Sequence, residues 1–255
     1  MLIVQLARAA VLAAAGAVVT LAQLELPSRS FWAQRTALQW MSVAVVAVAV
    51  CYDAVRSVNS AVQARRISRF DNDLRVVLSG TAFRVVEATG APFNNVAVRY
   101  YRLRRRVRGR RLSLIGAFMA GSEVADLSTD VRIGVGVVGT SFSTEMILTM
   151  EWREFVREAT RRGPAAWNQR SAAERLGLSW GQLRRSAQPE GVPEGVVASP
   201  TFDAAGRPDG CILVSGMLKP ADLESEEISR ILDWAATGLA RVGAPPAGWW
   251  GSHGR

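Results

Sequence analysis

The sequence predicts an α+β protein in which an N-terminal transmembrane helical hairpin precedes an antiparallel sheet flanked by helices. Two apolar stretches, at residues 9–26 and 37–55, predict the hairpin. Downstream, strand-like segments come in consecutive pairs and do not alternate with helices, which is typical of antiparallel sheets. The roughly 185 residues after the hairpin are enough for one domain with a substantial core.

The apolar stretches have the length and composition of membrane-spanning helices. The first has no charge before Glu25, and the second has none before Asp53. Each approaches the roughly 18–20 apolar residues that cross about 30 Å of hydrocarbon. A soluble helix pair would need a polar stripe, and a secretory signal peptide would explain only the first stretch. We therefore expect two transmembrane helices within residues 1–56, with the lipid bilayer as a partner.

Arginine placement predicts the orientation. Arg29 and Arg35 lie in the loop between the stretches, whereas four arginines follow the second stretch closely: Arg56, Arg65, Arg66 and Arg69. Positive charge near membrane spans favours the cytoplasmic side. We expect a bacterial cytoplasmic (inner) membrane protein with both termini and the soluble domain in the cytoplasm.

A juxtamembrane helix is expected at residues 57–90. Apolar residues recur there at near-helical spacing, and Gly90 followed by Pro92 ends the run. The second span therefore continues as a helix into a domain at residues 91–243.

Two strand pairs form the expected sheet. The first is Asn95–Leu103 with Arg111–Gly121, and the second is Gly195–Asp203 with Asp209–Leu218. Apolar and polar residues alternate in the first strand, as in a strand with one buried face.

Helical segments are expected between and after these pairs. Gly134–Gly139 leads into a short helix, and helical patterns follow at Thr149–Arg161 and Ser171–Ser186. A closing helix, Asp222–Val242, has an acidic first turn that complements the helix dipole. We expect residues 244–255 to be disordered.

Several of these segments resemble the GAF family of cytoplasmic sensory domains. Val131–Thr144 (VRIGVGVVGTSFST) is similar to the family's arginine, glycine-glycine and short-helix stretch. Gly195–Gly216 has the family's order of a strand ending in proline, a turn and a glycine-led strand, and Asp222–Val242 is like its closing helix. The resemblance covers about residues 69–242 and implies a GAF-like sheet. Residues 149–190 depart from it, being longer and more helical than usual.

The resemblance also implies a pocket for an unknown small-molecule ligand, between the sheet and the short helix. The residues expected to line it are Phe118, Arg132, Thr140, Phe142 and Thr201.

Eight arginines fall within the thirteen residues 99–111, nearly matching the net charge of +9. Such a turn attracts anionic headgroups or phosphate, although it is also typical of a solvated hairpin tip. The expected contacts to anionic lipid or phosphate are Arg102, Arg104, Arg105, Arg106, Arg108 and Arg110. Nucleic acid is an unlikely partner, because charge alone carries no sequence readout.

Two other motifs have weaker support. Gly134–Gly139 matches the dinucleotide pattern G-x-G-x-x-G but lacks the surrounding βαβ unit, which favours a simple turn. Ala172–Arg185 resembles a helix-turn-helix, a motif that needs a recognition helix free to enter the major groove.

Catalytic chemistry has little support in the sequence. His253 is the only histidine, and Cys51 and Cys211 are too few for a thiolate metal site. The GAF family's redox-active cysteines and cyclic-nucleotide signature have no matching residues. The sequence therefore predicts no enzyme activity, metal or cofactor.

The leading hypothesis is a membrane-anchored GAF-like sensory, ligand-binding or dimerisation module of bacterial signalling. We expect it to form a homodimer and to act on a protein signalling partner. One alternative is a two-transmembrane effector of a bacterial defence system, whose cytosolic domain senses a small ligand such as a nucleotide and triggers membrane disruption. A membrane-bound DNA-binding regulator is the lesser alternative.

Overall fold

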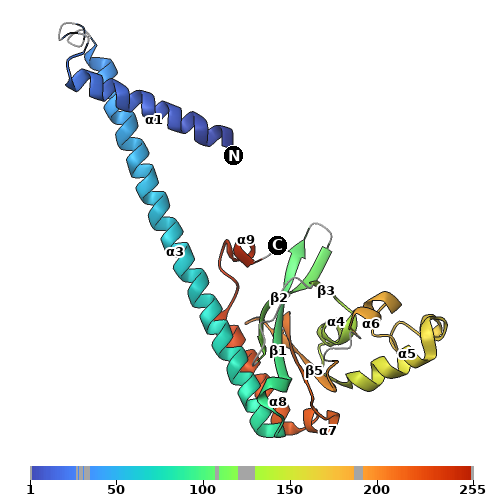
Figure 1. The fold of residues 1–255 in the computed structure, drawn as a ribbon. Coiled ribbons are helices and arrows are strands. Elements are labelled where there is room, and N and C mark those ends of the chain that lie inside the picture. Colours follow the sequence, from blue (N-terminus) through green and yellow to red (C-terminus); the bar gives the residue numbers. More distant parts are fainter. Residues whose placement is uncertain are drawn as a thin grey trace. The chain divides into compact units, whose positions relative to one another are not determined.

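The computed structural model describes residues 2–26, 28, 31, 35–106, 109–119, 130–186 and 192–253. The chain divides into two compact units, Met1–Arg65 and Arg66–Arg255. The first unit contains helix α1 (Leu2–Gln23) and the first part of helix α3 (Thr36–Thr89). The rest of α3 and all later elements form the second unit (Figure 1).

Among the described residues, α3 is the one helix that is long and apolar enough to cross a membrane. Its most apolar 18-residue window has a mean hydropathy of 1.7, and only 6% of that window is buried. The described apolar part of α1, Ala9–Gln23, is shorter than a membrane span. One of the two expected spans thus meets this test, while the two-helix hairpin stays a prediction.

In the second unit, α3 packs one face into the core. Phe70, Leu74, Leu78 and Val85 are buried at the spacing of a single helical face. The helix ends at Thr89, and Gly90 adopts a positive φ of 67° that favours glycine. The helix expected at residues 57–90 is therefore the second part of α3, in continuous register with the apolar part.

A six-stranded sheet forms the centre of the second unit, in the order β3-β2-β1-β6-β5-β4. All its pairings are antiparallel. Its strands are β1 (Val96–Arg106), β2 (Gly109–Met119), β3 (Asp130–Arg132), β4 (Leu148–Glu151), β5 (Gly195–Phe202) and β6 (Pro208–Gly216). The architecture is the α+β arrangement with an antiparallel sheet that the sequence predicts. Edge strands β3 and β4 were not predicted, because segments so short carry little periodicity.

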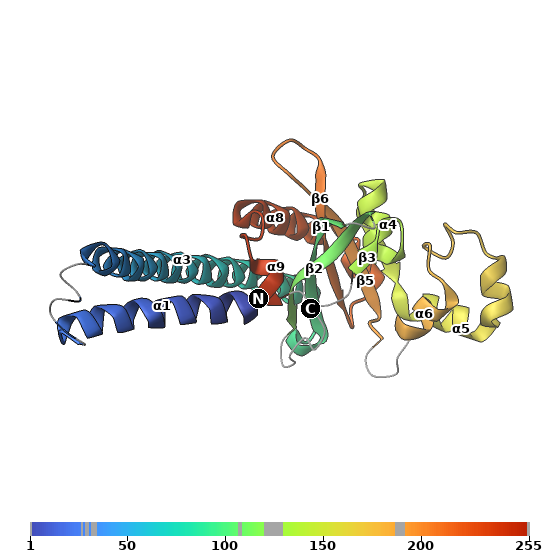
Figure 2. The same cartoon turned by 90° about the horizontal axis from the view of Figure 1, so that it is seen from above.

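Helices cover both faces of the sheet (Figure 2). α3 and α8 (Glu226–Val242) pack on one face, and α4 (Gly136–Thr144), α5 (Trp152–Gln169) and α6 (Trp180–Ser186) pack on the other. Alternate strand residues enter the two cores: Ile212 joins the α3–α8 side and Cys211 the α4 side. Short helix α7 (Pro220–Leu223) precedes α8.

The C-terminal segment corrects the expectation of a disordered tail. Residues 249–253 form helix α9 (Trp249–His253), and Trp249 is only 3% exposed. Its indole Nε1 donates to Asp71 Oδ1 at 2.6 Å, and its ring packs edge-on against Phe70. Burial of a large aromatic side chain outweighs the glycine and proline content on which the expectation depended. Residues 254–255 lie outside the described residues.

Candidate functional site

A glycine turn leads into α4, on the sheet face where the ligand pocket was expected. Gly134 and Gly136 have φ values of 75° and 67°, and the Gly134 amide donates to the Gly139 carbonyl. Because β3 is a three-residue antiparallel edge strand, no βαβ unit surrounds this turn. The glycines therefore shape the entry to α4.

Two contacts hold α4 close to neighbouring strands. A Cβ added at Gly139 would lie 2.2 Å from the Arg132 carbonyl oxygen, so only glycine permits this approach. The Ser141 hydroxyl donates to the Ala198 carbonyl of β5. These contacts fix which α4 side chains meet the sheet.

The expected pocket residues divide between the two faces. Phe142 is buried in the α4-side core. Thr140 lies on the same helix, and in the described part of the chain its hydroxyl is the buried side-chain oxygen that lacks a hydrogen-bond partner. Arg132, at the end of β3, is exposed, while its carbonyl faces Gly139. Phe118 packs against the α3–α8 core, and Thr201 bonds with Tyr100, which belongs to that core. The structure therefore brings together Thr140, Phe142 and the Arg132 backbone, and separates Phe118 and Thr201 from them.

A buried polar network surrounds Thr201. Its hydroxyl donates to Asp209 Oδ1 at 2.9 Å, and Asp209 Oδ2 lies 3.0 Å from Arg102 Nη2. Arg102 also donates to the Gly243 carbonyl at the end of α8. Burial raises the pKa of the Tyr100 phenol to about 12, and the negative charge of Asp209 adds to the rise. The network thus joins strands β1, β5 and β6 to α8.

This network changes the interpretation of the arginine hairpin. Arg102, expected to contact anions, has only 18% of its side chain exposed and pairs with Asp209 inside the molecule. The guanidinium of Arg104 lies 4.1 Å from the ring centroid of Trp250. Arg105 and Arg110 are exposed and face each other in register across β1 and β2. Arg108 and the side chain of Arg106 lie outside the described residues.

Ala172–Arg185, which resembles a helix-turn-helix in sequence, contains one helix, α6, and residues 172–177 before it are turns. The helix expected at Ser171–Ser186 is therefore limited to Trp180–Ser186, and Gly177, with a φ of 63°, lies in the turn before it. Ser171 with Glu174, and Ser179 with Gln182, form reciprocal hydrogen bonds in which the serine hydroxyl accepts from the later backbone amide. The second pair caps the start of α6. Arg184 is exposed on α6. DNA binding by this segment stays a prediction.

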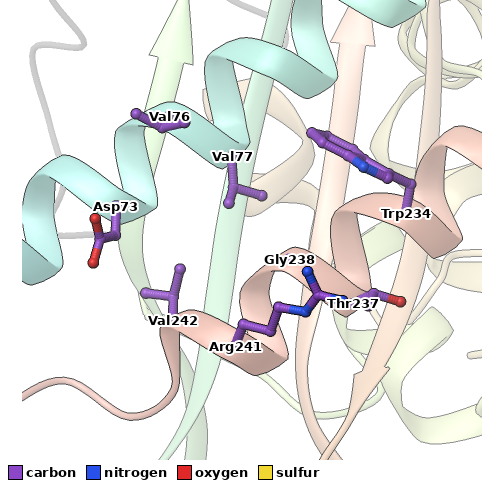
Figure 3. Close-up of a pocket in the computed structure, with 8 residues that line it drawn as sticks. All are labelled: Asp73, Val76, Val77, Trp234, Thr237, Gly238, Arg241 and Val242. Carbon is purple, nitrogen blue, oxygen red and sulfur yellow. The ribbon is translucent and has the colours of Figure 1, made fainter.

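Sequence reasoning missed a groove between α3 and α8, which Figure 3 shows. The groove has a volume of about 470 Å³. It is lined by Asp73, Val76, Val77, Trp234, Thr237, Gly238, Arg241 and Val242. The signal in the sequence was glycine inside two helices: a Cβ at Gly238 would lie 3.1 Å from Val77, and one at Gly80 would lie 3.1 Å from Trp234.

Comparison with known proteins finds distant similarity to solved structures alone. No family model matches the sequence, and no curated protein matches it. Solved structures with a similar fold include a GAF domain (13% identity, 59% of this chain and 66% of that chain covered, TM-score 0.36). The GAF domain of an Acinetobacter phosphoenolpyruvate-protein phosphotransferase is also similar, with 15% identity, 71% of this chain and 92% of that chain covered, and a TM-score of 0.40. A type II free methionine-R-sulfoxide reductase from Thermoplasma acidophilum is similar as well, with 14% identity, 68% of this chain and 93% of that chain covered, and a TM-score of 0.41.

These neighbours agree with a GAF-like fold, and at such TM-scores they carry no argument about ligand or partner. They do correct one prediction. Several similar structures are free methionine-R-sulfoxide reductases, so the expectation that the chain is not an enzyme is withdrawn.

The thiol within the second unit, Cys211, is buried on β6. Burial raises its pKa to about 12. The thiol therefore stays protonated near neutral pH, and a protonated thiol is a poor nucleophile.

Proposed function

We propose that the chain is a membrane-anchored sensory module of bacterial signalling, with a cytoplasmic GAF-like domain that binds a small ligand and pairs with a second copy. The observation that carries the proposal is the continuity of α3. This helix includes both the exposed apolar stretch and the face that packs into the domain core. A helix shared in this way can couple the domain to the bilayer.

The exposure of the apolar side chains supports the anchor. In the first part of α3, Val43, Val48 and Val50 are 45%, 69% and 62% exposed. Water disfavours such a surface, whereas hydrocarbon accommodates it. We place α1 in the bilayer as the second helix of the hairpin, following the orientation that the arginines indicate.

The basic hairpin supports a second membrane contact. Arg105 and Arg110 lie opposite each other, and like charges in that position repel unless an anion lies near. Anionic headgroups would supply that charge at about 1 kcal/mol per arginine near the surface. The ligand site of the proposal is the region around Thr140, whose buried hydroxyl is free to bond with a bound molecule.

The anchor is tested by alkaline carbonate extraction of membranes from cells that express the full chain. We expect the unaltered protein in the pellet. The double variant Val43→Arg, Val50→Arg should move largely to the supernatant, since each arginine costs about 2.5–3.5 kcal/mol at the centre of a span. The matched control is Val76→Arg, on the exposed side of α3 in the second unit, and it should stay in the pellet. Extraction of the unaltered protein by carbonate would refute the anchor.

A further inference from the structure

One carboxylate of α3 holds the C-terminal helix α9 through both of its oxygens. Asp71 lies near the start of the second unit, which begins at Arg66. Its Oδ1 accepts from the Trp249 indole at 2.6 Å, and its Oδ2 lies 3.2 Å from His253 Nε2. The imidazole also stacks on the Trp249 ring, with centroids 4.6 Å apart and planes inclined by 11°. We name Asp71, Trp249 and His253 the α9 clasp.

The histidine of the clasp can change its charge under mild conditions. His253 is the only histidine of the chain, and histidine is the side chain that ordinarily titrates between about pH 5 and 8. The side chains of His253 and Asp71 are 31% and 37% exposed, so protons reach the pair from solvent. Aspartate carboxylates are ordinarily ionised throughout that range. A change of pH across it therefore alters the charge of one partner alone.

The hydrogen bonds at the other ring nitrogen are complete only when the imidazole is protonated. His253 Nδ1 lies 2.9 Å from Ser252 Oγ, and this Oγ lies 2.8 Å from the Trp249 carbonyl oxygen. In a neutral ring whose Nε2 donates to Asp71, Nδ1 is an acceptor and competes with the carbonyl for one hydroxyl hydrogen. The other neutral tautomer places a lone pair against the carboxylate. In the protonated ring, Nδ1 donates to Ser252 Oγ while the hydroxyl donates to the carbonyl, so every donor has an acceptor.

Charge and stacking favour the protonated ring as well. An imidazolium faces the opposite charge of Asp71, and on the face of an indole it gains a cation–π attraction. On the other side of α9, the guanidinium of Arg104 lies 4.1 Å from the ring centroid of Trp250. Among the described residues, ion pairs and ring contacts thus bring two charged groups to α9, Asp71 from α3 and Arg104 from β1.

We propose that the α9 clasp is a pH-sensitive contact, which holds the C-terminal helix on α3 when His253 is protonated and weakens when the imidazole loses its proton. Because protonation strengthens the clasp, its stabilising effect is full near pH 5 and is lost as the pH rises through the range in which imidazole titrates. Opening uncovers Trp249, which is 3% exposed, and removes Trp250 from Arg104. A rise in pH therefore frees one more arginine of the β1–β2 hairpin for contact with anions.

Spin labelling of α9 in the detergent-solubilised full chain tests the clasp. The background is Cys51→Ser, in which the remaining Cys211 is buried. Gly251→Cys places the label on α9, at a position where a Cβ would meet nothing within 4 Å. Electron paramagnetic resonance distinguishes a docked label from a mobile one. The ratio of mobile to docked label should rise about threefold to fivefold between about pH 5.5 and about pH 8, as for a partly exposed charge pair.

Two substitutions identify the partners. His253→Gln removes the titrating group, and Asp71→Asn removes the charge while it keeps an oxygen that can accept from Trp249. Each should abolish the pH response. The matched control for the label is Ala240→Cys, an exposed position on α8, whose spectrum should be the same at both pH values. An unchanged ratio at position 251, an equal change at position 240, or a response that survives either substitution would overturn the proposal.

A second readout needs no label. The melting temperature of the unaltered chain should fall by about 2 °C more than that of His253→Gln when the pH is raised from about 5.5 to about 8. The difference arises because only the unaltered chain loses the stabilisation of a protonated clasp. Equal changes in the two proteins would overturn the proposal, even if a label at position 251 kept α9 from docking.

Discussion

Arg102 shows how neighbouring residues decide what a charge does. The sequence groups it with seven other arginines of the first hairpin. The structure pairs β1 with β6 so that Arg102 lies opposite Gly210, beside Asp209. Because this pairing joins residues over a hundred positions apart, no local pattern in the sequence could reveal the ion pair.

We expect Arg102→Met to lower the free energy of unfolding by about 2–3 kcal/mol, since it leaves the mostly buried Asp209 without its partner. The matched control Arg110→Met removes an exposed arginine and should change that energy by less than about 0.5 kcal/mol. Urea denaturation of the detergent-solubilised chain measures both. Equal effects of the two substitutions would show that Arg102 acts as a surface charge.

The expected pocket residues show a second limit at this scale. Thr140 and Phe142 could be predicted together because both lie on one short helix. Phe118 could not be assigned to a face, since the register of β1 and β2 shifts between Tyr100 and Tyr101. This shift adds a residue to β2 and turns Phe118 toward the α3–α8 core.

At the scale of the element, the glycines of α4 show what a motif does in its context. The pattern G-x-G-x-x-G was correctly interpreted as a turn, and the reason for its last glycine emerges only from the contact with β3. Gly139 lets the α4 backbone lie against the Arg132 carbonyl. Strands β3 and β4 escaped prediction, because their three and four residues are too few for a period to be recognised.

Gly139→Ala should lower the free energy of unfolding by about 1–3 kcal/mol, because the added methyl group overlaps a backbone oxygen that cannot easily move. Gly181→Ala is the matched control within α6, where a Cβ would meet nothing within 4 Å. That change should stabilise the protein by about 0.5–1 kcal/mol, as alanine usually does in a helix. Thermal unfolding compares the two. Stabilisation by both would show that α4 does not approach β3 as described.

At the scale of the whole molecule, the order of the longer elements could be predicted from the sequence, whereas β3, β4 and α9 could not. Paired strands and a helix that runs on from the second apolar stretch both follow from periodicity and from Gly90. The groove beside α3 could not be predicted, because Gly80, Gly238 and Trp234 come together only when α8 packs against α3. The order of the C-terminal segment likewise depends on the distant Asp71.

α3 extends from an apolar stretch into a packed domain, where a groove lies between it and α8. We propose that α3 enters the bilayer and holds the GAF-like domain on the cytoplasmic side.

Labelling of single cysteines with a membrane-impermeant thiol reagent determines on which side of the bilayer the domain lies. In the Cys51→Ser background, Ser28→Cys reports on the loop between α1 and α3, and Phe202→Cys reports on the domain. Ser28→Cys should react in intact cells, and Phe202→Cys should react only after the cells are permeabilised. Reaction of Phe202→Cys in intact cells, or of neither variant before permeabilisation, would contradict the proposed placement of the loop outside and of the domain in the cytoplasm.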